Sequence, residues 1–150
     1  MIVWKRGKKL GNNLFGANKK VGFTCSCFDL LHAGHILMLK DAKSQCDKLI
    51  VGLQTDPTLD RYEKNKPIQS YDERYIQLQA VKYVDGILRY ETENDLYKML
   101  YSLMPDVRIL GSDYEKKYFT GIDIAGIDIY FHKRDHDYST SSLREKIRKK

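Results

Sequence analysis

Two histidines three residues apart, His32 and His35, are the residues whose chemistry is easiest to interpret in this sequence. They follow an extended apolar stretch, residues 21–24, and precede a segment with helical spacing, so both lie at an expected strand-to-helix turn. The first turn of a helix carries unpaired N–H groups and the positive end of the helix dipole, and it therefore attracts anions. Two imidazoles at that turn favour a phosphate chain as the ligand, and Gly34 between them has no side chain to block its approach.

A second expected helix start, near the end of the chain, offers the same chemistry. Ser139 or Thr140 can cap this helix, and hydroxyl groups there would bind phosphate together with free backbone N–H groups. Arg134 precedes them and can donate charge-assisted hydrogen bonds to the same anion. Taken alone, this pattern is typical of a plain helix cap. Together with His32 and His35, it predicts a polyphosphate site.

The polar loop of residues 55–70 carries lysines that could close on a phosphate. Pro57 and Pro67 interrupt regular structure in this loop, which contains Lys64 and Lys66. Lysines on a mobile polar loop suit a charge clamp, although most exposed lysines are simply solvated. The pattern does not choose between Lys64 and Lys66.

These motifs together resemble those of the cytidylyltransferase family of nucleotidyltransferases. Residues 28–35 are similar to the family's F-D-x-x-H-x-G-H signature, and residues 134–141 to its R-x-x-x-I-S-T-T motif. Between them, residues 71–74 resemble Y-E-x-R, residues 82–85 resemble R-Y-V-D, and residues 111–114 resemble G-x-D-Y. The resemblance covers roughly residues 20–147.

The resemblance implies a role for each matching residue. The histidines would bind the nucleotide phosphates and stabilise the pentavalent transition state, while lysine and arginine offset its charge. The expected catalytic residues are His32, His35, Lys64, Lys66 and Arg134. The expected nucleotide-binding residues are Cys27, Phe28, Asp29, Gly34, Arg74, Gly111, Asp113, Tyr138, Ser139, Thr140 and Ser141. Mg²⁺ is expected to arrive with the nucleoside triphosphate, and no metal ligands are expected in the protein.

The implied reaction transfers a nucleotidyl group to a small phosphorylated alcohol or sugar and releases pyrophosphate. Transfer of CMP from CTP to glycerol-3-phosphate is the first expectation. Transfer of AMP from ATP to heptose-1-phosphate is the alternative, because residues 27–29, 66–68, 105–107, 111–114 and 138–140 also resemble heptose adenylyltransferases.

Three substitutions in these motifs keep a different class of function open. Ser26 and Asp137 stand where the family has glycine, and Lys82 stands where the glycerol-phosphate enzymes have arginine. A protein that binds a nucleotide without turning it over is therefore an alternative. A nucleic-acid-binding module would rest on the basic N-terminal residues alone.

Charge and composition restrict the possible partners. The 150-residue chain has a formal charge of +6, but residues 1–20 hold six of the 26 basic residues and no acid, which leaves 20 basic against 20 acidic residues. Residues 1–19 are therefore expected to form a basic arm before a nucleotidyltransferase domain at residues 20–150, and nucleic acid is an unlikely partner.

No apolar run approaches the ~20 residues that span a bilayer. Three cysteines, an odd number, favour free thiols that act as small hydrophobes in a cytoplasmic protein. The family resemblance implies a homodimer.

The elements that must position these residues alternate between strand and helix patterns. Strands are expected at 20–27, 48–54, 86–90, 107–110 and 127–132, and helices at 35–46, 72–83, 94–103 and from 139 or 140 onward. Such alternation predicts an α/β fold, a Rossmann-like three-layer sandwich with a mostly parallel sheet of about five strands. Ligands of open sheets bind beyond the carboxyl ends of the strands, where both histidines would lie.

Overall fold

The computed structural model describes residues 19–150, so the predicted basic arm lies outside the described residues except for Lys19. The strands are β1 (Val21–Ser26), β2 (Lys48–Gln54), β3 (Gly86–Tyr90), β4 (Val107–Gly111) and β5 (Asp128–His132). The helices are α2 (Ala33–Ser44), α3 (Tyr71–Gln79), α4 (Glu93–Leu103) and α5 (Thr140–Arg148), with single 3₁₀ turns at Pro57–Leu59 and Ser112–Tyr114.

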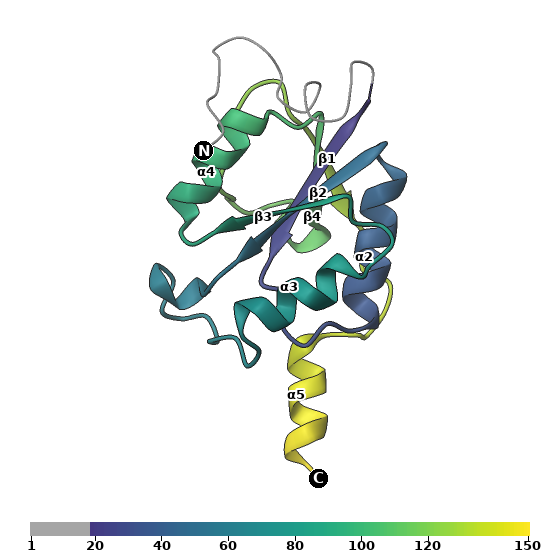
Figure 1. The fold of residues 1–150 in the computed structure, drawn as a ribbon, viewed down its shortest axis with the longest axis vertical. Coiled ribbons are helices and arrows are strands. Elements are labelled where there is room, and N and C mark those ends of the chain that lie inside the picture. The colour runs from purple at the N-terminus through teal and green to yellow at the C-terminus, as the bar shows by residue number, and fades with distance from the viewer. Residues whose placement is uncertain (1–18) are drawn as a thin grey trace.

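The five strands form one parallel sheet in the order β3-β2-β1-β4-β5. The chain first moves outward from β1 through β2 to β3, and then returns to the other side of β1 to add β4 and β5. Helices α2 and α3 pack on one face and α4 packs on the opposite face, which gives the predicted three-layer Rossmann-like sandwich (Figure 1). The order reverses between β1 and β4, where open α/β sheets bind their ligands.

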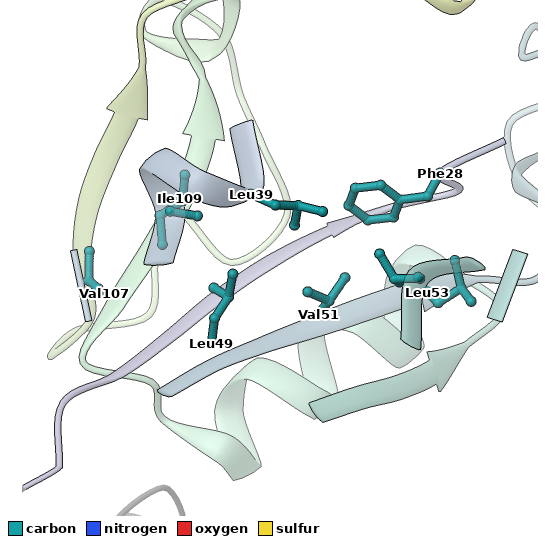
Figure 2. Packing of buried hydrophobic residues seen from close by; sticks show 9 residues of the cluster. Phe28, Leu39, Leu49, Val51, Leu53, Val107 and Ile109 are labelled. Carbon is teal, nitrogen blue, oxygen red and sulfur yellow. The ribbon is translucent and has the colours of Figure 1, made fainter. Parts of the chain in front are cut away.

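Each face of the sheet has its own hydrophobic cluster. Successive side chains of a strand point to opposite faces of the sheet, so the apolar residues of one strand contribute to both clusters. Figure 2 shows the α2 face, where Leu49, Val51 and Leu53 of β2 lie near Leu39 of α2 and Phe28. The α4 face is built from Val21, Phe23, Ile50, Tyr90, Leu96, Leu100 and Leu103. Because burial of one such side chain contributes about 1.5–3 kcal/mol, these clusters hold the strand ends in place.

Strands β1 and β4 separate soon after they begin. They pair only at Gly22 with Val107 and at Phe23 with Arg108, whereas β1 pairs with β2 over six residues. Beyond that point the ends of both strands, at residues 24–26 and 109–111, line a single cavity. The early end of this pairing therefore creates the space for a ligand.

The helix boundaries differ from the predicted ones where capping decides them. Helix α2 begins at Ala33, two residues earlier than expected, because the side chain of His32 accepts a hydrogen bond from the N–H of Gly34. Helix α4 is capped by Thr92 rather than by Asn94, since the Thr92 side chain accepts from the N–H of Asp95. Helix α5 is capped by Ser139, and it projects from the body of the domain (Figure 1).

Candidate active site

The cavity at the end of the sheet has a volume of about 1030 Å³ and brings together most of the predicted site residues. It is lined by Cys27, Phe28, His32, Gly34, His35, Lys64, Gly111, Asp113, Arg134, Tyr138, Ser139, Thr140 and Ser141. The turns of His32 and Thr140, which both line the cavity, are 108 positions apart in the sequence. Three predicted residues, Asp29, Lys66 and Arg74, do not line the cavity.

The two histidines of the first turn hold each other in a fixed geometry. Nδ1 of His32 accepts from the N–H of Gly34 at 3.0 Å, and Nδ1 of His35 accepts from the N–H of His32 at 3.3 Å. The rings stack with centroids 3.9 Å apart. Because both Nδ1 atoms accept, the proton of each neutral ring lies on Nε2. The pair is thus a capping box made of imidazoles, with both Nε2–H groups available as donors.

Burial favours the neutral form of both imidazoles. Burial, and to a smaller extent the neighbouring His32, lowers the pKa of His35 to about 4. Burial also lowers the pKa of His32, as do the charges of Arg134 and His136. At neutral pH the ring of His35 is therefore a hydrogen-bond donor without charge.

The two helix starts that were predicted to form one phosphate site are in direct contact. Nε2 of His32 lies 3.1 Å from Oγ1 of Thr140, and it donates because Nδ1 is already an acceptor. A Cβ placed on Gly34 would lie only 2.9 Å from the carbonyl oxygen of Tyr138, so only glycine fits between the two turns. Arg134 closes the second turn by donating to that same carbonyl at 2.6 Å.

Asp29 acts behind the cavity and not within it. Its carboxylate accepts hydrogen bonds from the N–H groups of Ile68 and Gln69, each at 2.9 Å, and from Arg144 of α5 at 2.9 Å. Burial alone would raise the pKa of Asp29, but these donors hold it below its ordinary value. Asp29 was expected to bind nucleotide, but the structure instead makes it join the lysine-bearing loop to α5.

Arg74 was expected to bind nucleotide, but the structure gives it a different position. Its side chain is only 2 % exposed and donates to four backbone carbonyls, those of Cys27, Gln54, Thr55 and Gln69. A guanidinium group has five N–H donors in a planar fork, so a single arginine can satisfy several carbonyls at once. Arg74 thus fastens the ends of β1 and β2 together beneath the cavity.

The loop lysines separate in space. Lys64 lines the cavity and Lys66 does not. Two of the three residues that depart from the family pattern do not line the cavity. Asp137 is exposed, and the ammonium group of Lys82 lies over the ring of Tyr83, 5.2 Å from its centroid. Ser26 does line it, at the end of β1.

Sequence reasoning missed one wall of the cavity, on the α4 side. There Arg61 forms an ion pair with Glu93 at 3.0 Å, Thr120 donates to Glu93 at 2.6 Å, and Arg108 is 97 % buried beside Phe119. Gln54 completes this polar wall. The available signal was Arg108, because a charged residue inside the apolar strand 107–110 requires a polar environment.

The reasoning also missed His132 and His136, which line the α2 side of the cavity. All four histidines of the chain therefore face the same cavity. His132 ends the last strand, and the rule that ligands bind beyond the carboxyl ends of parallel strands could have identified it.

Within residues 19–150, no group of three or more His, Cys, Asp and Glu side chains is arranged to hold a metal ion. The three cysteines are free thiols. In the same part of the chain, no helix has both the length and the apolar character needed to cross a membrane.

Two helix starts and four histidines meet at one cavity beyond the carboxyl ends of the parallel strands. The family model for cytidylyltransferase-like proteins matches residues 23–146, and the chain belongs to this family.

Named relatives agree with this assignment. The bifunctional protein HldE of Helicobacter pylori is 36% identical over 143 residues, which is 95% of this chain and 30% of that protein. HldE of Hyphomonas neptunium is 38% identical over 109 residues, 72% of this chain and 22% of that protein. The chain thus spans less than a third of the length of these relatives. The crystal structure of the lipopolysaccharide core biosynthesis protein from Thermoplasma volcanium matches with a TM-score of 0.63 at 27% identity, covering 81% of this chain and all of that chain.

Proposed function

We propose that the protein is an adenylyltransferase that transfers AMP from ATP to a sugar phosphate of the heptose-1-phosphate class and releases pyrophosphate. The observation that carries the nucleotidyl-transfer part of this proposal is the contact between His32 and Thr140, which joins two helix N-termini around one cavity. Because each N-terminus favours anions, the pair suits a chain of phosphates rather than a single one.

The chemistry requires placement and charge neutralisation more than a base. An oxygen of the acceptor phosphate attacks the α-phosphorus, the new P–O bond forms, and the bond to the bridging oxygen of pyrophosphate breaks. A phosphate monoester is already ionised, so no proton has to be removed from the nucleophile. His35 would donate its Nε2–H to the developing charge, and Lys64 and Arg134 would offset that charge. We expect Mg²⁺ to enter as part of the nucleotide substrate, with phosphate oxygens among its ligands.

Two observations favour the heptose and ATP pair over glycerol-3-phosphate and CTP. The named relatives are HldE proteins, which favour the heptose-1-phosphate alternative. In the polar wall, Nε of Arg61 and Nε of Arg108 are buried and have no hydrogen-bond partner among the described residues. An acceptor with several hydroxyl groups suits this wall, because unpaired buried polar groups are costly.

Pyrophosphate release, measured with ATP or CTP against heptose-1-phosphate or glycerol-3-phosphate, tests the proposal. We expect turnover with ATP and heptose-1-phosphate, and a loss of about 100-fold or more in kcat for His35→Ala, the usual cost of removing a transition-state donor. Preferred turnover of CTP with glycerol-3-phosphate would contradict the substrate choice. Nucleotide binding without pyrophosphate release from any pair would favour the non-catalytic alternative.

A further inference from the structure

The second pair of histidines lies beside the first. His132 ends β5 and is only 9 % exposed, and its ring centroid is 6.4 Å from that of His136. His136 in turn lies against the first turn of α2, because its Cε1 atom is 3.1 Å from the position of a Cβ on Gly34. His132 is therefore the deeper of two imidazoles that continue from the phosphate-binding turn into the cavity.

A partly buried hydrogen-bond network fixes the ring of His132. Its Nδ1 lies 2.6 Å from Oδ2 of Asp41 on α2, and the hydroxyl of Tyr130 donates to the same carboxylate at 3.1 and 3.2 Å. A carboxylate accepts hydrogen bonds only, so Nδ1 of His132 carries a hydrogen. The opposite nitrogen, Nε2, is buried and has no hydrogen-bond partner among the described residues. A buried nitrogen without a partner is costly, so a ligand atom is the natural partner for it.

We propose that Nε2 of His132 binds a phosphate group of the nucleotide, and that the ring takes up a proton when the nucleotide binds. This inference rests on the proposed function, because it assumes that the cavity holds a nucleoside polyphosphate. A neutral ring with its hydrogen on Nδ1 presents a lone pair at Nε2, which repels a phosphate oxygen. The protonated ring presents an N–H donor there, and Asp41 stabilises its charge.

The surrounding charges explain why the proton is taken up on binding. Asp41 from α2 favours the charged ring, and the Tyr130 hydroxyl, on the same strand as His132, donates to Asp41. The guanidinium group of Arg134, from the segment after β5, disfavours the charged ring. Asp113, after β4, also lines the cavity. A phosphate oxygen placed at Nε2 accepts a charge-assisted hydrogen bond only from the protonated ring, and protonation then becomes favourable.

His132 would thus differ from the first pair. His35, with its pKa of about 4, donates from Nε2 as a neutral ring, whereas His132 donates from Nε2 only when charged. Nucleotide affinity would therefore weaken as the pH rises and His132 loses its proton.

The test measures the dissociation constants of Mg-ATP and Mg-CTP between pH 6 and 8.5 in the full-length protein and in its His132→Gln variant. Glutamine keeps a polar side chain that does not titrate. We expect the dissociation constant of the wild type to rise with pH more steeply than that of the variant. Uptake of one proton on binding would make the difference at most about tenfold per pH unit. Protonation of the nucleotide itself affects both proteins equally. Equal slopes in the two proteins would overturn the inference.

Adenosine and cytidine serve as ligands without phosphate. They should bind His132→Gln and the wild type equally well, and a loss with these nucleosides would overturn the phosphate contact. NMR titration of the His132 ring in the wild type needs no variant: its midpoint should move to higher pH when Mg-nucleotide is added, and an unmoved midpoint would contradict the proposal. Pyrophosphate release by the wild type is measured separately. If the wild type releases pyrophosphate but its affinity and that of His132→Gln depend equally on pH, the proposed function stands and this inference fails.

Discussion

Replacing Arg74 should damage stability rather than nucleotide binding. The family resemblance assigns this residue to the nucleotide, whereas its four hydrogen bonds to backbone carbonyls assign it to the fold. The Arg74→Met variant keeps much of the side-chain volume and removes every donor. It therefore separates the two roles.

The size of the effect follows from the burial of these four bonds. The bond to the carbonyl of Gln54 is fully buried, and losing its partner costs about 1–3 kcal/mol. The other three bonds, to Gln69, Cys27 and Thr55, are partly buried, so water can replace the lost donor at a smaller cost. We expect a total destabilisation of about 3–4 kcal/mol, which lowers the Tm by roughly 6–16 °C for a chain of this size.

Urea denaturation gives the free energy of unfolding, and titration with Mg-ATP at a temperature where the variant is folded gives the affinity. The matched control is Arg89→Met, which removes an arginine whose side chain is 58% exposed. Its contacts among the described residues are an ion pair with Glu91 at 3.7 Å and a position over the ring of Tyr71, 4.7 Å from the centroid. This control should change the free energy of unfolding by less than about 1 kcal/mol. An Arg74→Met variant with wild-type stability and lost nucleotide affinity would refute the reasoning.

The loop lysines and the buried imidazole provide two further predictions. Because Lys64 lines the cavity and Lys66 does not, Lys64→Ala should lower kcat for pyrophosphate release by about tenfold or more. The control Lys66→Ala removes the same side chain two residues away and should leave kcat within about twofold. Equal effects of the two changes in steady-state assays would contradict this distinction. His35 has a pKa of about 4 in the folded protein and about 6.5 in the unfolded chain, so the unfolded state binds the proton first. The stability that His35 contributes is therefore complete above pH 6.5 and is lost as the pH falls toward 4, by about 2–3 kcal/mol at pH 4.5. Urea denaturation at pH 7 and 4.5 should show a smaller loss in His35→Gln than in the wild type, and an equal loss would mean that the ring is not held neutral.

Local patterns were enough to predict the sheet and the two helix starts that face the cavity. Strands that are buried between helices are rich in apolar residues, and His32 and Ser139 cap helices through their own side chains. The sequence therefore predicted the α/β sandwich and both helix starts from residues that act on their immediate neighbours, while phosphate binding at these turns stays a prediction.

What the sequence could not predict depends on contacts between distant segments. Arg74 is indistinguishable from a surface arginine until the ends of β1 and β2 are placed around it. The end of β5 could have pointed to His132, but the orientation of its ring depends on Asp41, 91 positions earlier in the chain. The separation of β1 from β4 after Phe23 decides the depth of the cavity, and no local pattern encodes it.

The last helix has a consequence for the behaviour of the protein in solution. None of the side chains of α5 is buried, and its described links to the domain include the contact of Thr140 with His32 and that of Arg144 with Asp29. One of the two turns that we propose to bind phosphate is therefore carried by an element that the hydrophobic core does not secure. Docking of α5 on the domain and binding of a ligand between the two turns should therefore stabilise each other, because a ligand that contacts both turns also holds α5 in place. The carboxyl-terminal segment is then the part of the domain whose amide exchange should respond most strongly to a bound substrate.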